Sequence, residues 1–548
     1  MPAVVSAISG VFAAVSSSAI GSIALRLLGS VALSALSQAL APQPKASGLR
    51  TENTLSGGTT PEAFMLGATA TGGTFVCPPM SHGSAGKTPN AYLTYVIELA
   101  GIPGHQLDGL ILNGERVAIL TDAPHADYGQ RIGGAYEGRA WIRYHDGTQT
   151  TADAMLLAKY PAPFVRPWSA DMVGEGICYA VLTFRYDREV FQGWPQCRFE
   201  VSSVPLYDPR RDSSVGGEGV HRWGQPETYV PSNNTAVQIY NAARGIALPS
   251  GDIWGGDIPA EDLPLAVWIA AMDAADSAAD DGAGGTEAAF RSGIEVQVAD
   301  EPFSVIEELL KGCTGVLTET GGVWSLRLGG PGLPVLFLAD DGIIADEPED
   351  FAPFPPIEQI FNAISATHPD PASLWESRES ELRTNPTWEA EDGGRRLPTA
   401  LSMPTVPYPV QVDRVCAALI ADHRRMRRHV ITLDTPGAVL EAGDTIAWTS
   451  AANGYDGKLF EVTEPIRDLI TQQVRASLRE VDPGDYDPPP GLVRPNVPVP
   501  TPVRPAVQSV PGFAVSPYIL EVEGADRRAG ILAQWDPEGA DDARGLRI

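Results

Sequence analysis

The chain has 548 residues, several times the ~100–200 residues of a single domain, so the sequence predicts several folded units. Hydrophobic residues make up 43% and charged residues 20%, which excludes a largely disordered chain, a collagen-like chain and a polytopic membrane protein. The 68 Asp and Glu against 39 Lys and Arg give a formal charge of −29, which repels phosphate backbones and argues against nucleic-acid binding through a broad basic face. The 56 glycines and 48 prolines favour a β-rich protein with many turns.

The first forty residues differ in composition from the rest of the chain. From Ala3 to Leu40 the only charged residue is Arg26, and the prolines of residues 41–45 follow. The sequence therefore predicts an apolar N-terminal helix over residues 1–45 that ends at these prolines. A convincing signal peptide would have a basic stretch first. We interpret the helix as buried against other subunits or against itself; a segment that enters a membrane when released, and a secreted protein, remain alternatives.

Residues 46–234 have the pattern of short β-strands separated by turns. Asn113-Gly114 stands between two β-type runs and is a strong hairpin signal. The predicted strands cover residues 92–99, 110–112, 116–120, 140–144, 179–186 and 197–203.

Residues 235–349 have a mixed pattern, which predicts an α/β unit. Helices are predicted at 235–244, 263–279 and 303–312, and a hairpin at 315–320 and 323–328. Residues 251–300 contain many acidic side chains and one basic residue, Arg291. We interpret that run as a solvated face, with the wall of an acidic cavity or channel as the alternative.

Residues 350–487 are predicted to contain strands at 362–367, 430–433 and 445–449 and one helix over 409–429. That helix ends in a basic cluster, which we expect to form ion pairs with another element or subunit; contact with DNA phosphates is the alternative. The candidate interface residues are Arg424, Arg425, Arg427 and Arg428. Residues 488–510 read as a proline-rich linker, and residues 511–548 begin a further small β unit with a strand at 531–535.

The sequence contains no convincing catalytic or metal motif. The stretch Ser81–Thr88 ends in Gly-Lys-Thr like a phosphate loop, but Ser81 stands where the first glycine is needed, and Pro89 opposes the helix that should follow. The histidines form neither HxH nor HExxH, and the five scattered cysteines form no CxxC. We therefore predict no cofactor, no metal and reduced, mostly buried thiols. A glycosidase carboxylate pair cannot be recognised from one sequence, so that possibility stays open.

The succession of several motifs resembles a known family. The apolar N-terminus is followed by Ser-Gly-Gly-Thr-Thr-Pro at 56–61, by the stretches 78–83 and 86–92, by Leu-Glu-Ala-Gly-Asp-Thr-Ile at 440–446, and by the proline-rich exit. This order resembles the tail tip (central hub) proteins of siphophages, which include the tip attachment protein J of lambda-like phages and the hub of gene transfer agents. The resemblance covers most of residues 40–487.

The resemblance implies a fold, an assembly and a location. Its fold is β-rich α+β, with β-barrel-like hub domains, an α/β hub domain at 235–349, a final hub domain at 350–487 and the start of a fibronectin type III-like domain. It implies a homotrimer at the virion tail tip, made in the host cytoplasm, in contact with distal tail and other tip proteins, the C-terminal end of the tape measure protein and, on ejection, the host envelope. Candidate contacts to a membrane or to the tape measure are Val11, Phe12, Ile20, Ile23, Leu27 and Leu28.

The expected function is that of a structural hub, not an enzyme, which closes the tail tube, organises the tip and gates genome ejection. A negatively charged lumen would let DNA pass without specific binding. Two alternatives stay open at this stage: a hub with a cell-wall-degrading activity, and a bacterial adhesin anchored in a membrane by the N-terminal helix.

Overall fold

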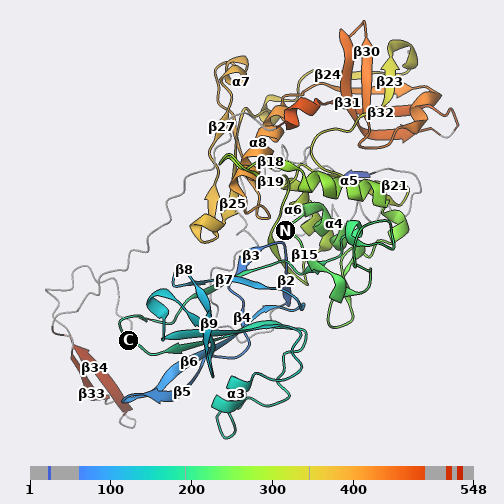
Figure 1. Ribbon diagram of the computed structural model, residues 1–548. Helices are drawn as coiled ribbons and strands as arrows, with labels where there is room; N and C mark the ends of the chain where they lie inside the picture. Colours follow the sequence, from blue (N-terminus) through green and yellow to red (C-terminus); the bar gives the residue numbers. More distant parts are fainter. Residues whose placement is uncertain are drawn as a thin grey trace. The chain divides into compact units, whose positions relative to one another are not determined.

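The computed structural model describes residues 23–25, 61–191, 193–344, 346–468, 470–487, 512, 514–520 and 528–534 (Figure 1). The chain divides into two units, Met1–Val499 and Pro500–Ile548. The described structure is rich in β-strands, has few helices, and its sheets are open, so the predicted β-rich class is confirmed at this level. Within the described residues, no helix has the length and apolar character needed to cross a membrane.

Two antiparallel sheets form the first part of the described chain. The larger has the strand order β4-β6-β12-β11-β10-β9, with β5 also paired to β6, and the smaller has the order β3-β13-β7-β8. The strands of the larger sheet are β4 (Thr74–Phe75), β5 (Met80–Ala85), β6 (Thr88–Ala100), β9 (Ile119–His125), β10 (Gly129–Ile132), β11 (Ala140–Asp146) and β12 (Cys178–Arg185). Those of the smaller sheet are β3 (Thr69–Thr71), β7 (Leu107–Leu112), β8 (Glu115–Val117) and β13 (Cys197–Val201).

The two sheets share one apolar core. Tyr95 and Leu182 of the larger sheet pack in the same cluster as Leu110 and Phe199 of the smaller one, and all four are buried. The opposite face of the larger sheet is covered by helix α3 (Ala154–Lys159). Strand β12 is buried along nearly its whole length because apolar side chains cover both of its faces, and such a strand is a continuous apolar run in the sequence.

Two tight turns in these sheets follow from local sequence. Asn113 and Gly114 link β7 to β8 with φ of 50° and 78°, the left-handed conformations that a two-residue hairpin requires. Gly86 and Lys87 link β5 to β6. The Gly-Lys-Thr stretch therefore belongs to a hairpin turn and not to the strand–loop–helix of a phosphate site.

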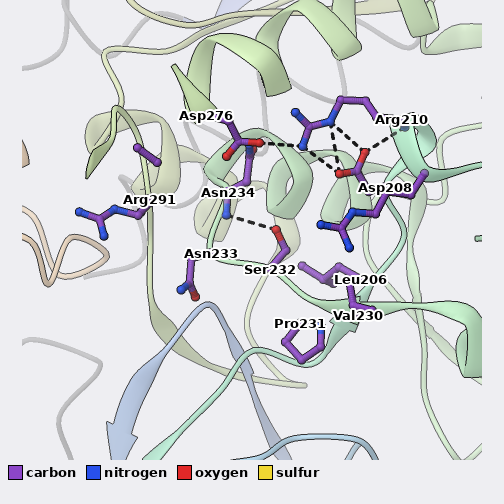
Figure 2. Close-up of a pocket in the computed structure, with 12 residues that line it drawn as sticks. Leu206, Asp208, Arg210, Val230, Pro231, Ser232, Asn233, Asn234, Asp276 and Arg291 are labelled. Atoms are coloured by element: carbon purple, nitrogen blue, oxygen red, sulfur yellow. Dashed lines mark hydrogen bonds and ion pairs between the residues drawn. The ribbon is translucent and has the colours of Figure 1, made fainter. Parts of the chain in front are cut away.

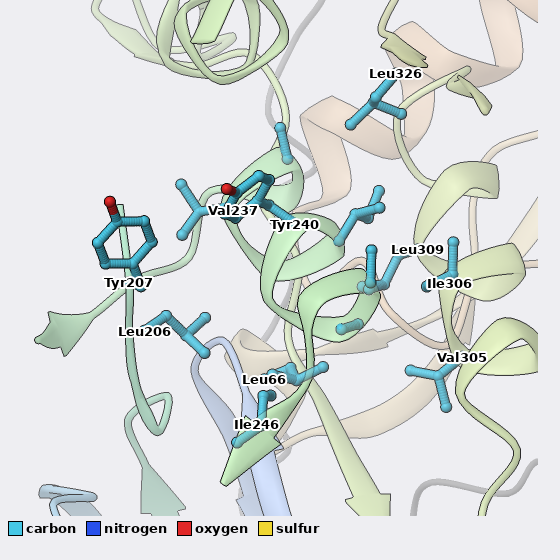
Figure 3. Close-up of a cluster of buried hydrophobic side chains, with 14 of the residues drawn as sticks. Leu66, Leu206, Tyr207, Val237, Tyr240, Ile246, Val305, Ile306, Leu309 and Leu326 are labelled. Carbon is cyan, nitrogen blue, oxygen red and sulfur yellow. The ribbon is translucent and has the colours of Figure 1, made fainter. Parts of the chain in front are cut away.

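Three helices surround a second core (Figure 3). They are α4 (Thr235–Arg244), α5 (Leu265–Asp276) and α6 (Pro302–Lys311). The hairpin β21 (Val316–Thr320) and β22 (Val323–Arg327) adds apolar side chains to the same core. Helix α4 is buried at every residue but Arg244; the Asn234 side chain caps its start and Gly245, at φ 103°, ends it. The three predicted helices and the hairpin are confirmed, with α5 shorter than expected.

Two strands from the beginning of the chain join this central part. Strand β2 (Ala63–Leu66) pairs with β20 (Ile294–Gln297), which places Phe64 and Leu66 in the core around α4. Strand β1 (Ile23–Leu25) pairs antiparallel with β21. The sequence predicts a helix at these three residues; that prediction is wrong there, because the edge of the β21–β22 hairpin offers backbone groups for a strand to pair with. The rest of the predicted helix lies outside the described residues.

Short strand pairs occupy the loops of this part. They are β14 (Pro205–Leu206) with β15 (Val230–Pro231), β16 (Ile246–Ala247) with β17 (Ile253–Trp254), and β18 (Ala278–Asp280) with β19 (Thr286–Ala288).

A four-stranded sheet with one long helix forms the next part. Strand β25 is central: β26 and β27 pair with it antiparallel, and β28 parallel. Helix α8 (Pro409–His423) packs on it through Val412, Val415 and Leu419, while the short helix α7 (Pro386–Glu391) lies in the β27–β28 connection. The strands are β25 (Ala363–Asp370), β26 (Glu376–Glu379), β27 (Arg383–Thr384) and β28 (Pro398–Ser402).

A six-stranded sheet, with the order β23-β30-β31-β32-β29-β24, completes the first unit. Its core contains Trp448, Phe460 and Leu478. Strand β23 lies at one edge and pairs parallel with β30, whereas the other pairs are antiparallel. The strands are β23 (Pro334–Ala339), β24 (Asp350–Ala352), β29 (Arg428–Leu433), β30 (Thr445–Ser450), β31 (Tyr455–Arg467) and β32 (Val474–Glu480).

The end of α8 corrects the predicted helix over 409–429. The helix stops at His423, and β29 begins at Arg428. The arginines therefore do not lie on consecutive helical turns. The reason is tertiary: backbone groups of β29 pair with β32 on one side and with β24 on the other. This sheet hydrogen bonding outweighs the intrinsic helix propensity of the arginines, which is favourable but small per residue.

The described part of the second unit is one antiparallel pair, β33 (Ala514–Leu520) and β34 (Arg528–Gln534). The strand predicted at residues 531–535 lies within β34 up to Gln534.

Candidate functional site

The four predicted interface arginines lie where α8 joins the six-stranded sheet. Arg424 directly follows α8, Arg425 and Arg427 lie in the connection, and Arg428 is the first residue of β29. Three of the four form ion pairs with carboxylates of the same chain. The sequence left open whether the partner is another element or another subunit, and the structure provides intramolecular partners for Arg424, Arg425 and Arg427. Arg428 is exposed.

Arg424 connects the end of α8 to the short helix α7. Its guanidinium lies 2.9 Å from carboxylate oxygens of both Glu391 and Asp392. It also lies over the ring of Trp388, 5.8 Å from the ring centre. These contacts hold α7, which is otherwise largely exposed, against the helix end.

Arg425 and Arg427 connect the same loop to the six-stranded sheet and to the chain that leaves it. Arg425 donates to both carboxylate oxygens of Asp485, each at 2.7 Å, and lies 2.9 Å from Asp482. This bidentate pairing raises the pKa of Arg425. Arg427 binds Glu480, whose carboxylate is buried and also lies 2.6 Å from the ammonium of Lys458.

A buried ion-pair network lies beneath this loop. The guanidinium of Arg479 lies 2.5 Å from Asp422 of α8 and 3.5 Å from Glu461 of β31. Glu461 also pairs with Arg327 of β22 at 2.9 Å. The hydroxyl of Tyr486 donates to Asp422 at 3.0 Å. One set of contacts thus joins α8, the β21–β22 hairpin, the six-stranded sheet and the segment that follows it.

Burial and pairing have opposite effects on the charges of this network. Burial lowers the pKa of Arg479, but the neighbouring Asp422 and Tyr486 raise it more, so the net shift is upward. For Arg327, burial is the largest effect and the pKa is lowered. Asp422 and Glu461 are 2% and 1% exposed. Because a buried charge without its partner is costly, loss of any one of these pairs would destabilise the packing of the elements that the network joins.

The apolar core of the six-stranded sheet takes no part in this junction. Its side chains come from the sheet and its own connections, between Leu336 and Leu478, and none comes from α8 or the β21–β22 hairpin. The described contacts that join the sheet to the rest of its unit therefore include a large charged component. We call the network of Arg327, Asp422, Glu461, Arg479 and Tyr486 the charged junction.

A polar pocket of about 200 Å³ lies beside the start of α4 (Figure 2). Arg210 binds Asp208 at 2.8 Å, Asp273 at 3.0 Å and Asp276 at 2.9 Å. Arg291 pairs with Glu287 and stacks on the ring of Tyr408. The pocket is lined by Leu206, Asp208, Arg210, Arg211, Val230, Pro231, Ser232, Asn233, Asn234, Asp276, Ala288 and Arg291.

The pocket has no pairing of a nucleophile with a base. Arg210, its most enclosed cation, is neutralised by carboxylates of the same chain, and the wall contains no histidine, cysteine or lysine. Across the residues that the structure describes, no group of three or more His, Cys, Asp and Glu side chains could hold a metal ion. The geometry is that of a structural ion-pair cluster.

The buried histidines are uncharged at neutral pH, and the buried cysteines are poor nucleophiles. Burial lowers the pKa of His82, His105 and His423 to about 4 each, so these imidazoles are neutral at pH 7. All five cysteines are free thiols and four are buried, as the sequence predicted. Burial raises the pKa of Cys178 to about 11 and that of Cys416 to about 12, which leaves them poor nucleophiles.

Of the six predicted apolar contact residues, only Ile23 is described; its backbone lies opposite Glu319 in the β1–β21 pair. Val11, Phe12, Ile20, Leu27 and Leu28 lie outside the described residues.

The carboxylates of the charged junction were missed at the sequence level. Asp422 and Glu461 stand within a chain of 68 acidic residues, and their partners are distant in sequence. One signal was present: in Val474–Glu480, charged residues interrupt an apolar strand pattern, which indicates a strand with a paired polar face.

Comparison with known proteins gives a family match over one segment of the chain. Residues 301–464 match the family model described as "Putative phage tail protein". The chain therefore carries a phage tail protein segment. The match indicates a structural protein of a phage tail and not an enzyme, in agreement with the resemblance seen in the sequence. None of the curated proteins matches the chain.

Solved structures resemble this chain in fold. A chain from the virion of a native gene transfer agent particle is 12% identical, with a TM-score of 0.53, over 90% of this chain and 99% of that one. A tail protein from Neisseria meningitidis MC58 is 10% identical, with a TM-score of 0.29, over 78% of this chain and 98% of that one. The 43 kDa tail protein of prophage MuSo2 from Shewanella oneidensis is 10% identical, with a TM-score of 0.26, over 78% and 96%. At these identities the likeness concerns the fold, and it rests on the first of the three.

Proposed function

We propose that this protein is the tail-tip hub of a siphophage-like particle, which closes the distal end of the tail tube and gates genome ejection. The observation that carries the proposal is the phage tail match over residues 301–464. This segment runs from α6 through the α8 sheet and into strand β31, so it contains most of the charged junction. The fold likeness to a gene transfer agent virion chain, which extends over 90% of the chain, supports the same conclusion.

In this proposal the protein is a homotrimer whose units have separate roles. Residues 46–234 form β-barrel-like hub domains, residues 235–349 the α/β hub domain and residues 350–487 the final hub domain. Residues 488–510 link them to the start of a fibronectin type III-like domain at 511–548. Support comes from the separate apolar cores of the N-terminal sheets, the α8 sheet and the six-stranded sheet. The core around α4 also takes Phe64 and Leu66 from the first segment, and β23 joins the six-stranded sheet, so the folded parts share elements across two of these boundaries.

The proposed partners follow from charge and composition. Distal tail proteins and other tip proteins surround the hub, and the apolar residues 1–45 contact the C-terminal end of the tape measure protein or, on ejection, the host envelope. Arg428, exposed at the start of β29, is the one member of the arginine cluster that we propose for contact with another copy. The charge of −29 per copy lets DNA pass through the lumen without being held.

The location and the assembly are tested together. Tails are purified from particles that carry an epitope tag after Ile548, and antibody-labelled particles are imaged, while light scattering of the purified protein gives its mass. We expect label at the distal tip and three copies per assembly. Label along the tube, or a protein that stays monomeric in the presence of the distal tail proteins, would contradict the hub proposal.

Gating is tested separately by deletion of residues 1–40. We expect tails to assemble poorly or to deliver no genome, because the segment that contacts the tape measure is missing. Tails of normal number that deliver their genome at the normal rate would show that residues 1–40 have no role in gating.

A further inference from the structure

The edge strand β23 presents a row of exposed apolar side chains. Leu333, Val335 and Phe337 are 89%, 53% and 80% exposed. They alternate with Leu336 and Leu338, which face the core of the six-stranded sheet, so the three exposed residues lie on one face at a spacing of two. We call these three residues the β23 row. A large apolar row at a sheet edge marks a surface that another segment covers.

The beginning of the chain reaches this edge through a short series of contacts. Ala24 of β1 lies opposite Thr318 of β21. The methyl group of Thr318 lies near Gly443, two residues before β30: a Cβ added at Gly443 would be 3.1 Å from it. Thr445, the first residue of β30, is the register partner of Pro334 at the start of β23. Strand β1 also lies beside β31 of the same sheet. The chain therefore enters strand β1 close to the end of the sheet at which the β23 row begins.

The segment before β1 is uncharged and rich in apolar residues, as a segment that covers an apolar surface must be. Residues 1–22 contain no Asp, Glu, Lys or Arg, in a chain where one residue in five is charged. Their large apolar side chains are Val4, Val5, Ile8, Val11, Phe12, Val15 and Ile20. Twenty-two residues can extend about 70 Å, so length does not prevent the segment from reaching any part of β23.

From these observations we propose that residues 1–22 pack on the β23 row of their own chain. Attachment at Ile23 gives the segment a high effective concentration at the row, so a small apolar contact is sufficient. The proposal concerns the chain before assembly and does not depend on the tail-tip function. If both hold, docking on β23 competes with the contacts of Val11 and Phe12 to the tape measure or the envelope.

Two other occupants fit the row less well. A second copy bound through three side chains would form an interface far below the roughly 20–30 residues per side of a stable complex. An anionic lipid surface would repel a chain of charge −29. Both remain outcomes that the experiment can detect.

Hydrogen–deuterium exchange of the full-length chain, followed by mass spectrometry of its peptides, tests the proposal. We expect amides within residues 1–22 to exchange at least about tenfold more slowly than in an unstructured peptide of the same sequence. Val335→Ser with Phe337→Ser should abolish this protection and leave the peptides of α4 and β12 unchanged. The matched control is Val165→Ser with Ile470→Ser, which alters two side chains that are 98% and 92% exposed elsewhere and should keep the protection.

Several outcomes would overturn the proposal. These are absence of protection in the wild type, protection that survives in the Val335→Ser, Phe337→Ser variant, and protection that appears only as protein concentration rises, which would assign the row to a second copy. Protection gained only with anionic vesicles would assign it to lipid. As an independent readout, deletion of residues 1–22 should increase the binding of an apolar fluorescent dye about twofold, and Phe337→Ser in the deleted chain should reverse the increase. Unchanged dye binding after the deletion would also overturn the proposal.

Discussion

Single buried carboxylates decide how the parts of this molecule are held together. Asp422 sits at the end of α8, 2% exposed, and accepts from both Arg479 and Tyr486. Loss of one member of such a network leaves a buried charge without its partner, which costs more than the intact pair contributes. The geometry of the charged junction thus depends on every member being present.

Asp422→Ala is expected to lower the free energy of unfolding by about 3–5 kcal/mol, because Arg479 then loses its closest carboxylate and keeps Glu461, at 3.5 Å, as its remaining carboxylate partner. Urea denaturation followed by circular dichroism measures the change. The control is Asp350→Ala, which removes the 3.5 Å pair with Arg475 between two largely exposed side chains and should change stability little. Equal effects of the two substitutions would show that the charged junction is not a stabilising contact.

Buried neutral histidines make the fold sensitive to acid. Burial lowers the pKa of His105 to about 4, against about 6.5 in the unfolded chain. Between these values the unfolded chain binds the additional proton, so stability is fully present above about pH 6.5 and falls as the pH drops toward 4. His82 and His423 act in the same direction.

His105→Asn is expected to reduce the slope of stability against pH between about 6.5 and 4, measured as the urea midpoint at a series of pH values. The side chain of His105 is fully buried and its Nδ1 is 2.8 Å from the carbonyl of Ser202. His125→Asn, at an exposed position, serves as the control for a histidine substitution elsewhere in the chain. A slope that His105→Asn does not alter would mean that His105 does not contribute to the acid sensitivity.

At the scale of elements, some segments pack so closely that their backbones leave no room for a side chain. Gly67 stands between β2 and β3 with φ 78°, and a Cβ there would lie 1.7 Å from the carbonyl oxygen of Ser292. This contact lies where strands β2 and β3 pack against the part of the chain that contains α4. Gly86, in the β5–β6 turn, has φ 59° but open space around it.

Gly67→Ala is expected to destabilise the protein by more than about 4 kcal/mol, because it adds a clash with rigid backbone to the strain of a left-handed residue. Gly86→Ala should cost only the strain, about 1–2 kcal/mol. Thermal unfolding of the two variants beside the wild type gives the comparison. Similar losses for both would show that the backbone near Ser292 moves aside.

At the scale of the whole molecule, the net charge determines how strongly copies of the chain repel one another during assembly. Each copy carries −29, so the proposed trimer brings together three strongly acidic chains. Repulsion between them extends over the Debye length, about 30 Å at 0.01 M salt and 8 Å at 0.15 M. Apolar contacts between copies must overcome this repulsion.

The trimer fraction is therefore expected to rise with salt. Sedimentation velocity at 0.01 M and 0.15 M sodium chloride, at one protein concentration, measures it. Arg428→Glu should shift the equilibrium further toward monomer if this residue contacts another copy, whereas Arg424→Glu should instead release α7. A trimer that dissociates as salt increases would show that ion pairs between copies dominate the interface.

The sequence alone determined the elements whose signals are local. Asn234 and Gly245 bound α4, Asn113-Gly114 makes its hairpin, and buried strands such as β12 are continuous apolar runs, because caps, turns and periodicity act over a few residues. The resemblance to phage tail proteins was also present in the order of its motifs. Only the tertiary structure decided where α8 ends, that Ile23–Leu25 form a strand, and which carboxylates neutralise the arginines. These three features depend on sheet edges and charged side chains that are tens to hundreds of residues apart in the sequence. A pattern within a few neighbouring residues does not show which distant segments will be in contact.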